Sequence, residues 1–215
     1  MSTNFKKRSI TSLILLSLII LIMNFNYILL YSLIVLGVLS IIEFLNLMTK
    51  IIKIKLLKLI ILSFFFIYIF LFCLIFFYFS QVSYLNIILF SLLFGCIASD
   101  IGGYIFGKLF KGPRLTKISP NKTISGAIGS LFLTYLTITS FLFFYTNDLN
   151  YKLLIISIVT SIACQFGDLF FSYLKRKAKL KDTGRVFPGH GGVLDRIDGI
   201  LIGLPIGYIS FILFY

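Results

Sequence analysis

Four aspartates lie inside or at the ends of long apolar stretches: Asp100, Asp168, Asp195 and Asp198. A charged group is unfavourable in hydrocarbon, so an ionisable residue within an apolar segment is a candidate for function. Asp195 and Asp198 are three residues apart, which places them on one face of a helix. Carboxylates without histidine or cysteine clusters favour hard cations, above all Mg²⁺. The four aspartates therefore predict one site that holds a divalent cation.

A basic segment, residues 175–196, leads up to the last two of these aspartates and includes Asp195. Residues 188–192 are rich in glycine, so backbone N–H groups there could bind an anion. The basic side chains suit phosphate groups. They are Lys175, Arg176, Lys177, Lys179, Lys181, Arg185 and Arg196. Together with a metal, this pattern is typical of phosphoryl or nucleotidyl transfer. A membrane-surface anchor would use the lysines but would not need buried aspartates.

The composition indicates which elements must position these groups. Of 215 residues, 59% are hydrophobic and only 13% are charged, which excludes soluble enzymes, disulfide scaffolds and nucleic-acid modules. A helix that spans a bilayer needs roughly 20 apolar residues. The sequence therefore predicts an all-α, polytopic membrane protein with about seven transmembrane helices. Their approximate ranges are 9–23, 27–48, 56–79, 85–109, 123–146, 152–174 and 196–215.

The distribution of basic residues predicts the orientation of these helices. If the N-terminus is cytoplasmic, 19 of the 20 Lys and Arg residues lie on the cytoplasmic side, and only Lys152 lies outside. This asymmetry is typical of the positive-inside rule. The net charge of +13 is therefore attributed to membrane topology and not to a nucleic-acid partner. Residues 108–122 and 175–195 are predicted cytoplasmic loops.

Other polar or small residues in the helices have simpler interpretations. Glu43, near the cytoplasmic end of its helix, is interpreted as reaching the membrane interface. Gly103 and Gly107 form a small-xxx-small pattern that predicts close helix packing. The cysteines lack paired spacing and are interpreted as packing residues. They are Cys73, Cys96 and Cys164.

The segment from Ser172 to Asp198 resembles the signature of phosphatidate cytidylyltransferases, also called CDP-diacylglycerol synthases. It reads Ser, then Lys-Arg, Lys-Asp, His-Gly-Gly and Asp-Arg-x-Asp, with every fixed position filled over 27 residues. Upstream, residues 100–108 and 119–123 also resemble family segments. The resemblance covers roughly residues 95–205, and the first 90 residues match only as apolar helices. It divides the chain into N-terminal helices, 1–90, and a catalytic domain, 91–215.

The resemblance implies that CMP is transferred from CTP to phosphatidate, giving CDP-diacylglycerol and pyrophosphate in phospholipid biosynthesis. It implies Mg²⁺ as cofactor, with room for a second cation, and metal ligands Asp168, Asp195 and Asp198. It also suggests a homodimer. The high Ile, Lys and Asn content indicates an AT-rich bacterial genome and hence the inner (plasma) membrane, and the basic loops place the active site on the cytoplasmic side. The implied catalytic residues are Asp168, Lys175, Arg176, Lys181, Asp182, His190, Asp195, Arg196 and Asp198.

A second group of residues is expected to bind substrate. Ser119, Lys122 and Thr123 match a cytoplasmic motif assigned to the substrate phosphate. A helix N-cap formed by Ser or Thr is the structural alternative for this motif. The other expected substrate-binding residues are Asp100, Gly189, Gly191 and Gly192.

The sequence departs from the family pattern at three positions. Phe171 stands where members usually have Glu, Ser125 stands at a second Glu position, and Asn121 replaces a Lys. The chain also has fewer residues before Asp100 than typical members. The two lost carboxylates would either weaken a second cation site or relax the metal requirement, and they leave the named aspartates in place.

Four other functions were compared with this interpretation. A CTP-dependent lipid-alcohol kinase of similar architecture would transfer the γ-phosphate instead of CMP. A transporter for an anionic solute would usually show inverted repeats and broken helices, and the sequence indicates neither. CDP-alcohol phosphatidyltransferases carry an Asp-Gly-x-x-Ala-Arg motif that this chain lacks. An inactive paralogue is the alternative that Phe171 and Ser125 would explain.

The predicted topology can be tested by cysteine labelling. The change is Asp148→Cys in a variant whose three native cysteines are alanine. Because Asp148 is assigned to an external loop, a membrane-impermeant maleimide should label it in intact cells. A cysteine in the 175–195 loop should be labelled only after permeabilisation. Labelling of position 148 from the cytoplasmic side alone would reverse the orientation.

Overall fold

The computed structural model describes residues 17–116, 118–147, 150–184, 186 and 191–215. Within these residues the protein is all-α, with no strand and one isolated antiparallel bridge between Arg114 and Thr123. Residues 17–24 are also helical. The long helices are α2 (Asn26–Ile51), α3 (Lys55–Gln81), α4 (Ser83–Phe110), α5 (Ile124–Thr146), α6 (Lys152–Lys177) and α7 (Leu194–Phe214).

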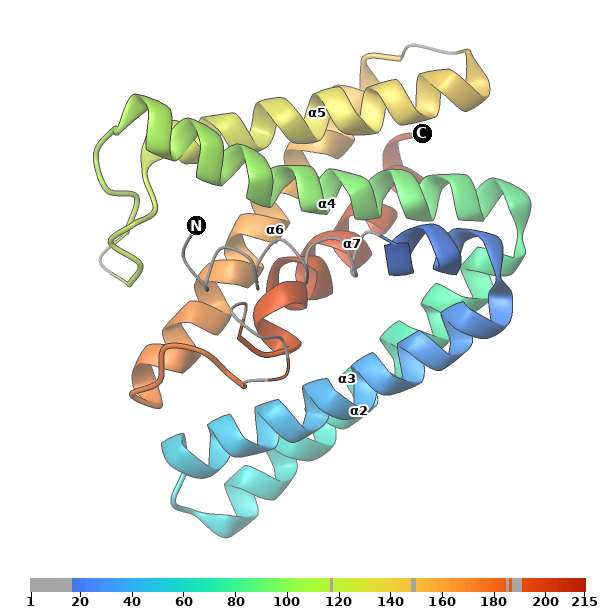
Figure 1. Cartoon of the computed structure of the whole chain (residues 1–215). Coiled ribbons are helices and arrows are strands. Elements are labelled where there is room, and N and C mark those ends of the chain that lie inside the picture. The colour runs from blue at the N-terminus through green and yellow to red at the C-terminus, as the bar shows by residue number, and fades with distance from the viewer. Residues whose placement is uncertain (1–16, 117, 148–149, 185, 187–190) are drawn as a thin grey trace. The chain divides into compact units, whose positions relative to one another are not determined.

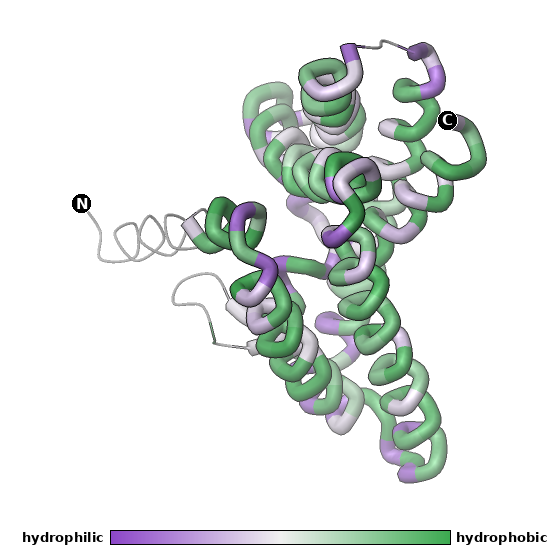
Figure 2. The backbone as a smooth tube through the Cα atoms, turned by 90° about the vertical axis from the view of Figure 1, so that its right-hand side faces the viewer, coloured by the Kyte–Doolittle hydropathy of each residue, from purple (hydrophilic) through white to green (hydrophobic). Residues whose placement is uncertain are grey.

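All six long helices have the length and composition to cross a membrane. Figure 2 shows that most of each helix is hydrophobic, with the hydrophilic residues mainly at helix ends and in the connections. Large apolar side chains such as Phe64, Phe144 and Ile212 remain exposed, as expected where lipid replaces water. The protein is therefore a polytopic membrane protein.

Six of the predicted spans are confirmed as helices. Of the first predicted span, residues 17–23 are helical, and residues 9–16 lie outside the described residues. The count of seven spans and the cytoplasmic N-terminus stay predictions.

The chain forms two compact units. The first comprises residues 1–81 and 174–197, and the second comprises residues 82–173 and 198–215. The first unit thus contains α2, α3, the end of α6 and the first turn of α7. The predicted functional division at residue 90 is a separate matter and stays a prediction.

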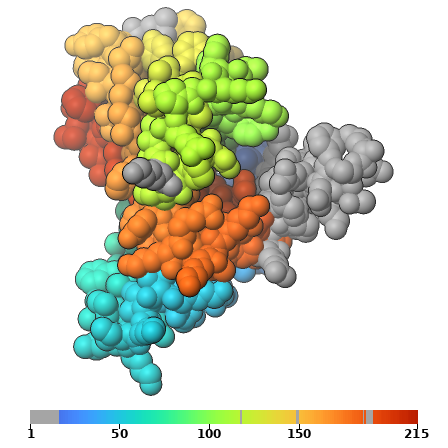
Figure 3. Space-filling model, turned by 90° about the vertical axis from the view of Figure 1, so that its left-hand side faces the viewer, coloured from blue at the N-terminus to red at the C-terminus, as the bar shows by residue number. Residues whose placement is uncertain are grey.

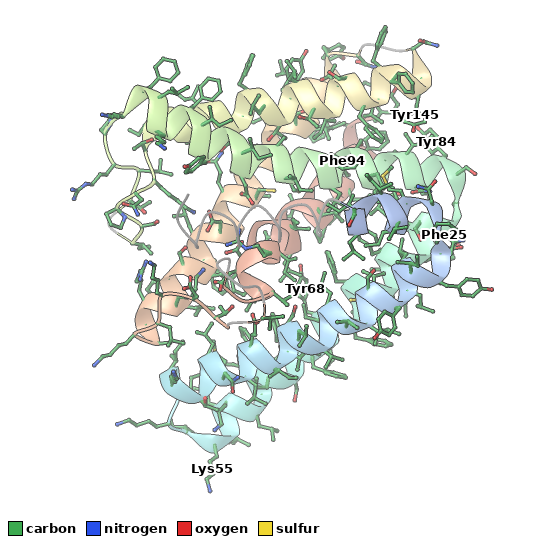
Figure 4. The ribbon with its side chains drawn as sticks, in the orientation of Figure 1. Phe25, Lys55, Tyr68, Tyr84, Phe94 and Tyr145 are labelled. Atoms are coloured by element: carbon green, nitrogen blue, oxygen red, sulfur yellow. The ribbon has the colours of Figure 1, made fainter. Side chains whose placement is uncertain are left out.

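In the first unit, α2 and α3 form a helical hairpin (Figure 1). Phe44 of α2 stacks on Phe65 of α3, with ring centroids 3.8 Å apart. At Gly37 a Cβ would stand 3.4 Å from Ile69, so the helices are close but not crowded there. Lys55, where α3 begins, points away from the hairpin (Figure 4).

In the second unit, α4 and α5 pack through small residues. A Cβ on Gly102 would stand 2.8 Å from the carbonyl carbon of Gly129, so the backbones are in direct contact. Ser130 Oγ donates to the carbonyl oxygen of Ser99 at 2.7 Å. Gly103 faces Ser130 and Gly107 faces Thr123, which confirms the predicted packing role of both glycines.

Aromatic rings continue this α4–α5 contact. Phe94 of α4 lies 5.5 Å from Phe141 of α5, and Phe141 lies 5.2 Å from Tyr145, measured between ring centroids. Figure 4 shows Phe94 on α4 and Tyr145 near the end of α5. Rings at these separations add to the packing of the two helices.

Helices α6 and α7 approach through a second set of glycines. Gly199, Gly203 and Gly207 recur every four residues along α7, each against α6. A Cβ on Gly203 would stand 3.2 Å from the Cα of Cys164 and would overlap its Sγ atom. The Cys164 side chain therefore occupies the space that the absent side chain of Gly203 leaves open. The three cysteines are free, which agrees with their predicted packing role.

The α4–α5 contact gives a stability prediction. Gly102→Ala places a methyl group against the Gly129 backbone, which cannot rotate away. We expect a loss of about 1–3 kcal/mol in the free energy of unfolding, seen as a lower melting temperature in detergent. Gly37→Ala is the matched control, because a methyl group has room there. Equal melting temperatures for both variants would contradict the tight contact.

Candidate active site

Asp195, in the first turn of α7, is surrounded by donors within the first unit. Its Oδ1 atom accepts from Lys175 Nζ at 2.7 Å. Its Oδ2 atom accepts from the backbone N–H groups of Thr183 and Gly192 at 2.8 and 2.9 Å. The side chain is 4% exposed. We call Asp195, Lys175, Thr183 and Gly192 the Asp195 cluster.

The end of α6 brings Thr183 to this cluster. Lys179 adopts a left-handed backbone conformation with φ 57°. The N–H of Leu180 donates to the carbonyl oxygen of Lys175 at 2.8 Å, as in a Schellman helix end. The chain therefore turns back directly after α6, and Thr183, four residues after Lys179, lies beside Asp195.

The glycines of the signature leave room for carboxylates. Gly191 has φ +87°, a conformation that favours glycine, and a Cβ there would stand 2.8 Å from Asp195 Oδ2. A Cβ on Gly192 would overlap the carboxylate of Glu43. Gly192 also donates its N–H to Asp195, so this N–H is not available for the predicted anion. Gly189 and His190 lie outside the described residues.

Glu43 of α2 is a further member of this region that sequence reasoning assigned incorrectly. It is 4% exposed and accepts hydrogen bonds from Thr183, Val193 and Leu194. The prediction that Glu43 reaches the membrane interface is wrong, because its carboxylate accepts hydrogen bonds from buried N–H and O–H groups inside the protein. The only signal in the sequence was its position in an apolar helix.

In the second unit, Lys122 forms an ion pair with Asp168 of α6. Both side chains are partly exposed. The loop before α5 holds Lys122 by its backbone: its N–H donates to Ser119 at 3.1 Å, and its carbonyl accepts from Leu115 at 2.7 Å. The structure thus pairs a predicted substrate-binding lysine with a predicted metal ligand.

Thr123 caps the N-terminus of α5. Its Oγ1 atom accepts from the N–H of Gly126 at 3.1 Å, so the structural alternative for this motif is confirmed at Thr123. Ser125 Oγ lies 3.0 Å from Thr123 Oγ1 and accepts from the N–H of Gly112 at 3.3 Å. The hydroxyl that replaces the expected Glu therefore ties the loop to the helix start.

Asp100 and Asp198 both lie beside Gly199 in the second unit. Asp198 is 6% exposed, and its Oδ1 accepts from the N–H of Gly199 at 3.0 Å. Asp100 is exposed, and its Oδ1 would lie 3.8 Å from a Cβ on Gly199. A Cβ on Gly167, the residue before Asp168, would stand 2.6 Å from the carbonyl oxygen of Asp198. Close α6–α7 packing therefore places the backbone beside Asp168 against that of Asp198, and Asp100 of α4 lies near Gly199.

The remaining predicted residues lie at the surface. Figure 3 shows the α4–α5 connection and the end of α6 at the surface of the face drawn. Several basic side chains at the end of α6 and in the segment that follows it are exposed. The exposed candidates are Arg176, Lys181, Asp182 and Arg196. Phe171, at the other expected Glu position, is buried and contacts Phe170 edge-on.

The metal ligands stay a prediction. Among the described residues, no three His, Cys, Asp or Glu side chains form a group that could hold a metal ion. Asp168 and Asp195 each pair with a lysine ammonium group within their own unit. Carboxylate oxygens are also the ligands that Mg²⁺ prefers.

Comparisons with known proteins agree with the signature. The pattern of the cytidylyltransferase family matches residues 1–214. A phosphatidate cytidylyltransferase of Staphylococcus haemolyticus (strain JCSC1435) is 43% identical over 133 residues, covering 61% of this chain and 51% of the relative. One from Staphylococcus aureus (strain COL) is 40% identical over the same length and the same shares.

A third relative comes from a mycobacterium. The phosphatidate cytidylyltransferase of Mycobacterium leprae (strain TN) is 43% identical over 117 residues, which is 52% of this chain and 36% of the relative. The chain spans about half the length of the staphylococcal relatives that it matches. Since the family pattern covers nearly every residue, the chain belongs to the cytidylyltransferase family.

Proposed function

We propose that this protein transfers CMP from CTP to phosphatidate, forming CDP-diacylglycerol and pyrophosphate. A phosphatidate oxygen attacks the α-phosphorus of CTP, and the bond between the α-phosphorus and the bridging oxygen breaks. Pyrophosphate then leaves with that oxygen. The relatives carry the name of this activity. The observation that supports it best is the Asp195 cluster, in which signature residues Lys175, Gly192 and Asp195 bond directly to one another.

The residues of the first unit supply positive charge for the triphosphate. Lys175 is held on Asp195, which fixes the ammonium group at one place. Arg176 and Lys181 are exposed, and their charged groups suit phosphate oxygens. Preorganised positive charge of this kind stabilises the charge that develops on pyrophosphate as it leaves.

The residues of the second unit suit the lipid phosphate. Lys122 extends from a loop that its own backbone hydrogen bonds hold in place, and Ser119 lies in the same turn. A phosphate monoester carries close to two negative charges, so it can compete with Asp168 for the Lys122 ammonium group. We assign the phosphatidate phosphate to Lys122 and Ser119.

The family resemblance is the support for Mg²⁺ as cofactor. It assigns the ion to Asp168, Asp195 and Asp198, and a bound ion would neutralise charge on the triphosphate and on pyrophosphate. Phe171 and Ser125 provide no carboxylate at the two other expected positions, so one cation is the simpler proposal.

The cellular setting belongs to the same proposal. The distribution of basic residues favours both basic loops in the cytoplasm, where CTP is available, and the high Ile, Lys and Asn content favours the inner (plasma) membrane of a bacterium. The partners are CTP, phosphatidate and membrane lipid, with no nucleic acid. A homodimer rests on the family resemblance.

The proposed reaction is tested with labelled CTP. Membranes that contain the protein receive Mg²⁺, phosphatidate and CTP labelled at the α- or the γ-phosphate, and label is followed into the lipid extract. We expect transfer only from the α-position and only with phosphatidate, because CMP is the group that moves. Transfer from the γ-position to a lipid alcohol would identify a kinase. No transfer by well-folded protein would identify an inactive paralogue.

The role of Asp195 gives a second prediction. Asp195→Asn keeps the size of the side chain but removes the charge that holds Lys175. We expect kcat to fall by about 10²–10³-fold with unchanged membrane insertion. Ser210→Ala is the control, since Ser210 is also buried in α7 but bonds only within that helix. Unchanged kcat for Asp195→Asn would remove Asp195 from the proposed mechanism.

A further inference from the structure

Glu43 of α2 holds the segment that carries the signature. Its Oε1 atom accepts from the N–H of Val193 at 2.9 Å. Its Oε2 atom accepts from the N–H of Leu194 at 2.9 Å and from Thr183 Oγ1 at 2.7 Å. These residues are 140 to 151 positions from Glu43 in sequence, yet all belong to the first compact unit.

The start of α7 explains why a carboxylate is needed there. The first N–H groups of a helix have no partner within the helix. Val193 and Leu194 have apolar side chains and cannot accept these hydrogen bonds. Glu43 takes two of the N–H groups and Asp195 takes that of Gly192. The two carboxylates together thus accept from three successive N–H groups. Their negative charge also interacts favourably with the positive end of the helix dipole.

Thr183 couples the two carboxylates. Its Oγ1 atom lies 2.7 Å from Glu43 Oε2 and 3.0 Å from Asp195 Oδ2. A hydroxyl has one hydrogen to donate, and the shorter distance favours donation to Glu43. The N–H of Thr183 then donates to Asp195. A change at Glu43 therefore reaches Asp195 through a single residue.

We propose that Glu43 is a positioning residue: it fixes Thr183 and the first turn of α7, and through them the direction of the Asp195 carboxylate. Neighbouring glycines support this role. A Cβ on Gly184 or on Gly192 would overlap the Glu43 carboxylate, so the backbone closes around it on two sides. This proposal rests on the proposed function of the Asp195 cluster.

The test uses Glu43→Gln in the full-length protein. Glutamine has the same size, but one oxygen becomes an NH₂ group that faces an N–H or O–H donor. We expect kcat per folded molecule to fall about tenfold to a hundredfold, with the KM for CTP changed by less than about threefold. Ser40→Ala is the matched control. Ser40 is equally buried on α2 but bonds only to Leu36 of its own helix.

A second readout does not depend on activity. Lys179 and Lys181 are exposed beside the segment that Glu43 holds, so trypsin cleavage there reports local opening of the segment. In detergent, Glu43→Gln should be cleaved at least about fivefold faster than wild type, and Ser40→Ala should not. If wild type transfers no CMP but the cleavage difference appears, the proposed function fails while the anchoring of the segment by Glu43 stands.

Thr183 variants complete the test. Thr183→Val removes the hydroxyl and should lower kcat in the same range, while Thr183→Ser should restore most of it. The loss in the double variant Glu43→Gln/Thr183→Val should be smaller than the product of the single losses, because one chain of contacts is broken. If Glu43→Gln does not fold, the contrast between the two Thr183 variants decides the matter.

Two results would overturn the proposal. One is a lower melting temperature for Glu43→Gln with an unchanged kcat per folded molecule, which is what a purely structural role predicts. The other is a kcat for Thr183→Val equal to that of Thr183→Ser.

Discussion

A carboxylate that is buried away from water needs hydrogen-bond donors. In the first unit, the backbone N–H groups at the start of α7 are these donors. Glu43 and Asp195 share the N–H groups of residues 192–194 and the Thr183 hydroxyl. The geometry of the signature segment follows from this requirement. Residues 184, 191 and 192 are glycines because the space that a side chain would occupy is filled by carboxylate oxygens. Lys175 completes the arrangement by balancing part of the charge.

The second unit meets a different constraint, since helices in lipid gain little from burying apolar surface against one another. Its helices instead approach one another closely at glycines. These backbone contacts fix where along the helices the acidic residues lie beside one another. Gly102 against Gly129 joins α4 to α5, and Gly167 against Asp198 joins α6 to α7. Close backbone packing and the placement of acidic residues are thus one structural feature. A bulkier residue at Gly167 would displace the carbonyl group of Asp198 itself.

The departures from the family pattern have local explanations in this structure. Ser125 hydrogen bonds with Thr123 and Gly112, so the loop that carries Lys122 is closed by hydroxyl groups. Phe171 is buried against its neighbours, which replaces a charged group by apolar packing. Neither substitution disturbs Asp168 or Asp195, whose lysine partners are in place. This is consistent with a family member whose central residues are retained.

The sequence alone determined the helical membrane fold and the family, because apolar runs of about 20 residues and a 27-residue motif are local patterns. The tertiary structure decided which groups meet. Glu43 shows this difference most clearly: its partners lie at least 140 residues away, so no periodicity or spacing indicates them, and its position near a helix end favoured the wrong interpretation. Thr123 shows the reverse, since an N-cap depends on neighbours three residues away, and the sequence offered it as the structural alternative to a substrate-binding role. Hydrogen bonds within a helix turn can be predicted from sequence spacing, whereas those between distant segments depend on how the helices pack.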